Sequence, residues 1–486
     1  MPAAARIRRR RLATGLGRDL DLLVGANVLW GAGNGCYTYL LPLYAAELGA
    51  APHQIGAVLA LTSAVQALVY LPAGLLADRL SWKRLMLAGW CLGPAAAVVF
   101  GLATAWQHLV PAVVLFASVA WCAPAYHSYI AAAADRRDLP YAFSLMFAGA
   151  TVGGTLAAPL GGWLAQAGGL RWTFAGAFAG YAASTVLIAL LNPRPAPPPR
   201  PGESPTQQPH RQSDAPASGA EAREPSRAAP AAARPDAQRG PRPWLRLAGR
   251  PLAAVGRGPL AGVLAATAAI EFAANLGQPL APNWLADQYG FSPAAVGGLG
   301  SVGAAGAAAL AISLGRLQRR RGGHWSLALA AAALIGYAVL LLAARTWALA
   351  AAAYALRGAS NVLPSLTLAL AATVLTGGAA ASPPPPQAAP RGRGAPVDGP
   401  APHAPARVAG TRPIGLGFAL HRAVAAAAVT LATVTAGWLY GVWHPLPFLA
   451  SAVALAAFLA AGAAVARLPG RVRALGPAVS RTAVGA

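Results

Sequence analysis

Long apolar stretches recur along the chain and alternate with short polar stretches. Each apolar stretch has about twenty residues or more, enough for a helix to cross the hydrocarbon core of a bilayer. The sequence lacks the ten-residue segments of alternating polarity that form membrane β-barrels. We therefore predict twelve membrane helices, at residues 21–47, 54–78, 84–105, 108–134, 140–165, 172–192, 259–286, 294–317, 325–344, 346–376, 413–440 and 446–467.

Polar, proline-rich connectors separate the predicted helices into two groups of six. Residues 193–257 are rich in Pro, Arg, Ala, Gln and Ser. Such a stretch cannot bury enough apolar surface to order itself. We expect a basic cytoplasmic tail (1–20), a six-helix bundle (21–192), a disordered cytoplasmic linker (193–257), a second bundle (258–467) with a disordered cytoplasmic loop (377–411), and a cytoplasmic tail (468–486).

Composition and charge placement agree with this all-α integral membrane organisation. Hydrophobic residues make up 56% of the chain and charged residues 11%, whereas soluble proteins carry about 25% charged residues. The net charge of +24 arises in the tail, short loops and connectors, not in a patch on a folded domain. This distribution follows the positive-inside rule. It predicts a multi-pass protein of the cell (plasma or inner) membrane with both termini cytoplasmic, and no nucleic-acid partner.

The two predicted halves are related by an internal repeat. A shift of 241 residues superposes glycine, proline and arginine positions around the second helix of each half, and it places Asn34 on Asn275. Two parallel six-helix repeats are therefore predicted. The other superposed pairs are Gly49 and Gly290, Pro52 and Pro293, Gly56 and Gly297, Gly74 and Gly315, and Arg79 and Arg320.

The loop after the second predicted helix carries the most specific motif. It reads GLLADRLSWKR from Gly74 to Arg84. Gly74 permits close helix approach, and Asp78 can interact with a helix N-terminus or an arginine. The segment resembles the G-x-L-a-D-r-x-g-r-k/r motif of the major facilitator superfamily. The resemblance implies two six-helix bundles and a cytoplasmic gate formed by Gly74, Asp78, Arg79, Lys83 and Arg84.

The second half carries an altered copy of this motif. Arg319 stands where the first copy has Asp78, between Gly315 and Arg320. Because the acidic residue is lost, we expect a weaker or different gate there. We place these basic residues, with Arg316 and Arg321, in a short loop after the eighth helix.

Glu271 is the only acidic residue deep inside a predicted membrane helix. A charge at this depth costs roughly 2.5–3.5 kcal/mol on insertion scales and marks an ion pathway or binding site. Asn275 lies one turn away on the same face, and Asn34 and Asn27 lie on the equivalent first helix. We expect these residues to line a polar cavity near the bilayer midplane.

Arg357 also lies near the midplane and is placed to pair with Glu271. Three roles remain open: a structural ion pair, proton exchange by Glu271 tuned by Arg357, or binding of a cationic substrate by Glu271. His421 and Arg422 lie near the cytoplasmic end of the eleventh helix. There we expect them to snorkel or to receive Asp78 rather than to contact substrate.

These features predict a monomeric secondary active transporter of a small molecule that works by alternating access and is driven by a proton or ion gradient. Export of a drug or metabolite is favoured because the cavity should be apolar with few fixed charges. Uptake of a sugar or an organic acid is the alternative, and an acid site should hold more than one buried arginine. A membrane enzyme or a non-transporting sensor is more remote, and we expect no catalytic residues, cofactor or metal, because acidic and histidine residues are scattered.

Overall fold

The computed structural model describes residues 15–77, 80–135, 138–193, 259–375 and 414–467. The linker from residue 194, the connector predicted at 377–411, the C-terminal tail and most of the N-terminal tail lie outside the described residues. All regular structure in the described residues is helical. Nine helical stretches among them are long and apolar enough to cross a membrane. The predicted fold class, all-α and membrane-embedded, is confirmed.

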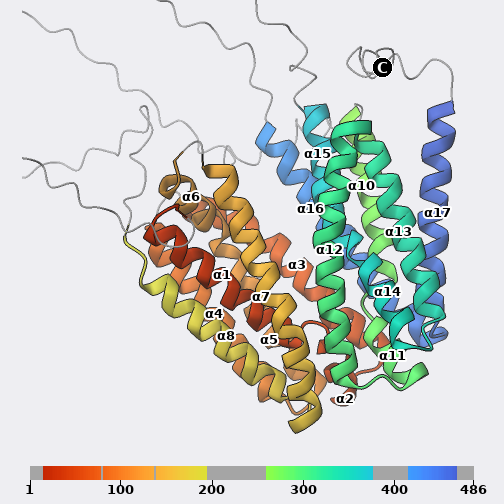
Figure 1. Cartoon of the computed structure of the whole chain (residues 1–486), viewed down its shortest axis with the longest axis horizontal. Helices are drawn as coiled ribbons and strands as arrows, with labels where there is room; N and C mark the ends of the chain where they lie inside the picture. The colour runs from red at the N-terminus through yellow and green to blue at the C-terminus, as the bar shows by residue number, and fades with distance from the viewer. Residues whose placement is uncertain (1–14, 78–79, 136–137, 194–258, 376–413, 468–486) are drawn as a thin grey trace, which may run out of the picture. The chain divides into compact units, whose positions relative to one another are not determined.

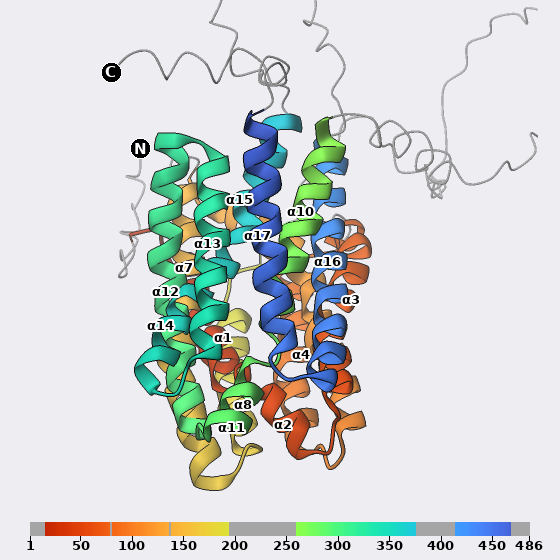
Figure 2. The ribbon, with the colours of Figure 1, turned by 90° about the vertical axis from the view of Figure 1, so that its right-hand side faces the viewer.

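The helices follow the predicted ranges closely (Figure 1). The first half comprises α1 (Arg18–Tyr37), α2 (Leu41–Glu47), α3 (Pro52–Ala77), α4 (Trp82–Gly101), α5 (Leu109–Ser118), α6 (Ala123–Ala133), α7 (Leu139–Gly168) and α8 (Trp172–Ala189). The second half comprises α10 (Pro259–Leu276), α11 (Ala281–Tyr289), α12 (Pro293–Arg321), α13 (Gly323–Leu342), α14 (Trp347–Arg357), α15 (Ala359–Leu375), α16 (Ile414–Val442) and α17 (Leu446–Arg467). Helices α10, α13, α16 and α17 run side by side in the second half (Figure 2).

Four predicted helices are broken rather than continuous, which corrects the sequence prediction. The ranges 21–47, 108–134, 259–286 and 346–376 each form two α-helices: α1 and α2, α5 and α6, α10 and α11, α14 and α15. Pro42 and Pro282 occupy the first turns of α2 and α11. Proline lacks a backbone N–H and is favoured in the first turn of a helix, where that N–H has no partner within the helix. At the break between α14 and α15, a Cβ on Gly358 would lie 2.6 Å from the Cα of Ala307 in α12, so close packing requires glycine there.

The internal repeat is visible in the backbone. The repeat mates Gly49 and Gly290 follow α2 and α11, and their φ angles are +83° and +68°. This left-handed region favours glycine because it has no Cβ. The α1–α2 break and the α10–α11 break also fall at equivalent places in the two halves.

Glycines bring the two halves into direct backbone contact at two equivalent places. A Cβ on Gly56 of α3 would lie 2.7 Å from the carbonyl oxygen of Thr433 in α16. Likewise, a Cβ on its repeat mate Gly297 of α12 would lie 2.6 Å from the carbonyl oxygen of Ala158 in α7. Small residues permit such approach between membrane helices. The α3–α16 and α7–α12 contacts thus join the halves in a symmetric way.

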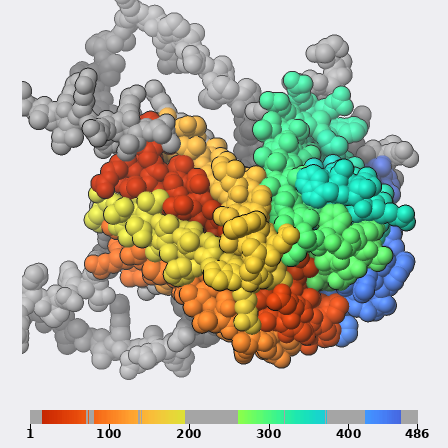
Figure 3. Space-filling view, turned by 60° about the horizontal axis from the view of Figure 1, so that its bottom comes forward, coloured from red at the N-terminus to blue at the C-terminus, as the bar shows by residue number. Residues whose placement is uncertain are grey.

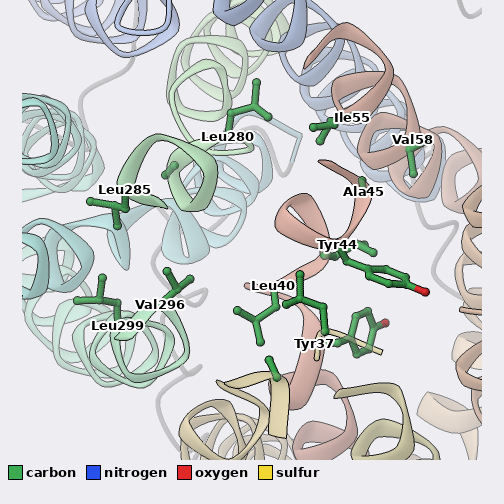
Figure 4. Packing of buried hydrophobic residues seen from close by; sticks show 14 of the residues in the cluster. Tyr37, Leu40, Tyr44, Ala45, Ile55, Val58, Leu280, Leu285, Val296 and Leu299 are labelled. Carbon is green, nitrogen blue, oxygen red and sulfur yellow. The ribbon is translucent and has the colours of Figure 1, made fainter. Parts of the chain in front are cut away.

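Buried hydrophobic residues form one core shared by both halves and two cores that belong to one half each. The shared core combines residues of α2 and α3, such as Tyr44 and Ile55, with residues of α11 and α12, such as Leu285 and Val296 (Figure 4). The second core, which includes Leu20, is confined to the first half. The third, which includes Ile270 and Leu314, is confined to the second half. The halves are therefore packed together near α2 and α11, and they have separate cores toward the opposite ends of their helices.

Candidate functional site

A cavity of about 780 Å³ lies between the two halves. Its walls come from α1, α7, α12, α15 and α16. The wall on α12 is made of alanines, whereas α1 with the two residues after Tyr37, and the first half of α15, contribute most of the polar groups. The polar lining residues besides Arg422 are Asn34, Thr38, Tyr39, Thr151, Asn361 and Ser365.

Arg422 is the charged side chain among the described residues that line this cavity. It lies on α16 and is exposed. From the sequence we expect Arg422 to snorkel or to receive Asp78 rather than to contact substrate. In the structure its side chain reaches the cavity instead, because it lies well inside α16 on a face that looks between the halves.

Glu271 is buried in α10, with 2% of its surface exposed. Its Oε2 atom accepts a weak hydrogen bond of 3.4 Å from the side-chain nitrogen of Asn275, and the same nitrogen donates to the Glu271 backbone carbonyl at 2.8 Å. Its Oε1 atom has no hydrogen-bond partner among the described residues. Leaving a buried carboxylate oxygen unpaired is costly. Protonation of this carboxyl group would therefore remove part of the free-energy cost of its burial.

The charge that acts on Glu271 comes from Arg422 rather than from Arg357. Helix α10 packs against α13, α15, α16 and α17, and the Arg422 guanidinium on α16 is the charged group with an electrostatic effect on Glu271. The sequence placed Arg357 near the same depth and suggested that it pairs with Glu271. Arg357 instead contacts Gln278, which lies seven residues after Glu271 in the chain, so position along the helix separates Arg357 from Glu271.

Arg357 has a different set of partners. Its Nε atom donates to the side-chain oxygen of Gln278 at 3.2 Å, and Ser360 donates to the same oxygen at 3.1 Å. The guanidinium lies 5.4 Å from the ring centre of Tyr39 and 5.2 Å from that of Tyr354, within cation–π range. Gln278 was missed by the sequence analysis, although Glu271, Asn275 and Gln278 follow the i, i+4, i+7 spacing of one helix face.

Tyr39 links the two halves at the edge of the cavity. It lies between α1 and α2, lines the cavity, and packs against Gly300 of α12. Arg357 stacks on the same ring. The green surface of α12 and the cyan surface of α14, which holds Arg357, adjoin in the space-filling view (Figure 3).

The two predicted asparagines of α1 occupy different surroundings. Asn34 lines the cavity, and its side-chain oxygen accepts a hydrogen bond of 2.9 Å from Tyr181. Asn27 donates to the Leu23 carbonyl at 2.7 Å and to the Tyr126 hydroxyl at 2.9 Å. Asn27 therefore lies within first-half packing, apart from the cavity lining, and Asn275 lies beside Glu271.

The gate motif of the first half is described only in part. Asp78 and Arg79 lie outside the described residues. Gly74 lies in the last turns of α3, and Lys83 and Arg84 begin α4, where Lys83 is half-buried and Arg84 is exposed. The gate role of these residues stays a prediction.

The second-half copy lies in a helix and not in the loop that the sequence predicted. Helix α12 continues through Gly315, Arg319 and Arg320 to Arg321, and it ends at Gly322, whose φ is +93°. The run contains no helix breaker before Gly322, and basic residues are favourable near a helix C-terminus. The side chain of Arg320 is exposed.

Comparisons with known proteins identify the fold. No curated protein sequence is similar enough to this chain to count as a relative. A mutant of the nucleoside transporter NupG has a similar structure, with a TM-score of 0.65 and 14% identity over 92% of this chain and 99% of that chain. A second NupG structure gives 0.61 and 13% over 93% and 100%. A bacterial homologue of the human lysosomal transporter Spinster, in an inward-facing and unoccupied conformation, gives 0.49 and 18% over 91% and 97%.

At these identities the solved structures establish the fold alone. The family model described as Major Facilitator Superfamily matches residues 23–389, which is most of the chain. The match runs through both halves, and it includes Glu271, Arg357 and the Gly74–Arg84 segment. The chain belongs to the Major Facilitator Superfamily.

Proposed function

We propose that this protein is a secondary active transporter that moves a small molecule by alternating access and couples this movement to protons through Glu271. The observation that carries the proposal is the buried carboxyl group of Glu271, whose Oε1 has no hydrogen-bond partner among the described residues, with the charge of the cavity-lining Arg422 acting on it. Ionisable residues inside membrane proteins are expensive and usually serve an ion pathway or binding site.

The separate packing of the halves supports alternating access. The shared core and the glycine contacts join the halves near α2 and α11, while each half keeps its own core toward the other end. A cavity lies between them. With the termini cytoplasmic, as the charge distribution predicts, this arrangement corresponds to a state closed to the outside. Rocking of one half against the other would expose the cavity to the opposite side.

A proton fits the position of Glu271 better than a substrate does. The side chain is 2% exposed and does not line the cavity. A cationic substrate at Glu271 would have to displace the packing of α10, whereas a proton needs only a transient water or polar contact. We therefore assign substrate binding to the cavity and proton exchange to Glu271.

Export of a drug or metabolite and uptake of a sugar or an organic acid both fit this cycle. The alanine-rich wall on α12 supports an apolar substrate body. An acidic substrate is supported by Arg422, which lines the cavity, although Arg422 is exposed and the expected second buried arginine is not part of the described lining. Whether the protein takes up or exports its substrate depends on whether protons and substrate move in the same or in opposite directions.

The proposal is tested by transport into proteoliposomes. A radiolabelled compound that stabilises the purified protein in a thermal-shift screen, and that exchanges in counterflow, serves as the substrate. In the wild type an imposed pH gradient should drive its accumulation. In Glu271→Gln the accumulation should be lost while counterflow exchange persists, because exchange needs no net proton movement. Undiminished pH-driven accumulation in Glu271→Gln would refute the coupling role.

A further inference from the structure

Arg422 gives the cavity a positive charge that faces the substrate space. The side chain is exposed, and the rest of the described lining is uncharged. Two neutral hydrogen-bonding residues, Asn361 and Ser365 of α15, line the same cavity. A guanidinium offers a planar fork of N–H donors that matches the two oxygens of a carboxylate. The cavity therefore holds the chemistry to bind one acidic group.

The guanidinium of Arg422 is available for this role. Within the described ranges, no hydrogen bond and no ion pair occupies its nitrogen atoms, although its charge acts on Glu271. The carboxyl group of Glu271 is hydrogen-bonded to Asn275 through Oε2, and its Oε1 remains unpaired. Arg422 thus lines the cavity on a helix that packs against α10, and its charge also acts on Glu271.

We propose that the transported molecule is a small organic anion whose carboxylate, or similar acidic group, binds Arg422, and that Glu271 competes with this group for the Arg422 charge. The inference rests on the proposed function and adds the substrate class to it. It also adds a reason for coupling, because one guanidinium is shared by the proton-binding group and the substrate.

The charges define the direction of the coupling. When Glu271 is ionised, its negative charge partly balances Arg422 and disfavours a second anion. When Glu271 takes up a proton, the Arg422 charge is unbalanced and an anion binds more tightly. By linkage, the anion must equally favour protonation of Glu271. Proton and anion therefore bind together and move together.

The other groups near Glu271 do not replace Arg422 in this scheme. Of the helices packed against α10, α16 supplies the charge that acts on it. The neighbouring titratable residue of α16, His421, is buried, and its ring lies toward Thr367 of α15. On α10 itself, Asn275 is uncharged. A cationic substrate would meet the repulsion of Arg422 and find Glu271 out of reach.

The test uses the purified full-length protein and matched probe compounds. Benzoate, benzamide and benzylamine share one scaffold, and 2-naphthoate, 2-naphthamide and 2-naphthylmethylamine share a larger one. The two carboxylates should raise the melting temperature by about 2 °C or more at saturating concentration, as ligand linkage requires. The amides and amines should not. Stabilisation by the amides or amines equal to that by the carboxylates, or no stabilisation by the carboxylates, would overturn the inference.

Arginine variants test whether the carboxylates bind at Arg422. Arg422→Gln should abolish stabilisation by both carboxylates, and Arg422→Lys should retain part of it because the charge remains without the fork. Arg345→Gln, an exposed arginine between α13 and α14, is the matched control and should behave as the wild type. Monodisperse elution from size-exclusion chromatography verifies folding. An unchanged carboxylate effect in folded Arg422→Gln would contradict the proposal.

A pH series separates this inference from the proposed function. In the wild type the carboxylate effect should grow as the pH is lowered from about 8 to 5, a range in which both probes are ionised. In Glu271→Gln it should persist and lose its pH dependence. If the protein shows no preference for the carboxylates, but its pH-driven transport still depends on Glu271, the inference is refuted and the proposed function stands. If the protein prefers the carboxylates, but Glu271→Gln leaves pH-driven transport unchanged, the proposed function is refuted and the anion preference stands.

Discussion

The equivalent helices α1 and α10 both end at a break before a short helix, yet they carry different side chains at matching positions. Where α10 has Glu271, the repeat shift places Trp30 on α1, and where α10 has Gln278 it places Tyr37. Trp30 packs against the rings of Trp90 at 5.4 Å and Tyr181 at 4.5 Å. Asn34 and Asn275 are the pair that remains alike.

The same exchange of an aromatic residue for a charged one occurs between the equivalent helices α5 and α14. Arg357 of the second half corresponds to Phe116 of the first, and Phe116 stacks on Trp30 at 6.4 Å. The first half is therefore an aromatic, tightly packed body around the cavity, and the second half carries the charges. The two halves therefore share the glycine contacts that join them, but only the second half places charged side chains at these matching positions. We call this difference the proposed division of work between the halves.

The largest effect on transport is expected at the glycine contacts, which are alike in the two halves. Gly56→Leu and Gly297→Leu each place a side chain against a backbone carbonyl of the other half, at 2.7 and 2.6 Å from the first added carbon. Each should lower the transport rate in proteoliposomes at least tenfold, since the halves can no longer close against each other.

The two variants should fail to similar degrees, because the contacts are equivalent. Gly262→Leu, at a glycine of α10 with open space around it, is the control and should transport normally. Normal transport by either contact variant would show that the glycine contacts do not form during the cycle.

A smaller effect on transport is expected at Arg357, where the second half has a charge and the first half has an aromatic ring. Arg357→Gln removes a guanidinium that holds Gln278 and stacks on Tyr39 at the cavity edge. It should lower the transport rate severalfold, because cation–π contacts of about 0.5–2 kcal/mol help to position Tyr39. Phe116→Leu, at the repeat mate, should lower thermal stability and leave the rate per folded molecule nearly unchanged. Equal rate losses in both variants would break the proposed division of work.

The smallest effect is expected at the hydrogen bond between Tyr181, which packs among the aromatic rings of the first half, and the cavity-lining Asn34. Tyr181→Phe removes the hydroxyl that donates to Asn34 at 2.9 Å. The free energy of unfolding should fall by about 1 kcal/mol, as measured by denaturant unfolding in detergent micelles. Substrate affinity should change little, because Asn34 still faces the cavity. A loss of affinity above tenfold would assign the first half a direct role in binding.

Much of the fold could be predicted from the sequence. Apolar stretches gave the helix ranges, and the repeat of Gly49 and Gly290 predicted the parallel halves. The breaks in four helices were missed because apolar residues continue on both sides of each break. A break depends on proline position and on tertiary packing, which hydropathy does not report.

The site was predicted less completely. Depth in the membrane identified Glu271 and Arg357, because a charge there is unusual. It did not give their partners, since partners depend on the helix face and on neighbouring helices. Arg422 was placed near a helix end by counting residues, and its contact with the cavity arises from the way α16 packs beside the first half.

The most direct test of the central claim is to measure proton movement itself. Proteoliposomes that contain a trapped pH indicator are given a substrate gradient, at equal pH on both sides and with membrane potential clamped. The account predicts that substrate moving through the wild-type protein carries protons with it, and that Glu271→Gln exchanges substrate without any change of internal pH. Equal proton movement through the wild type and Glu271→Gln would contradict it.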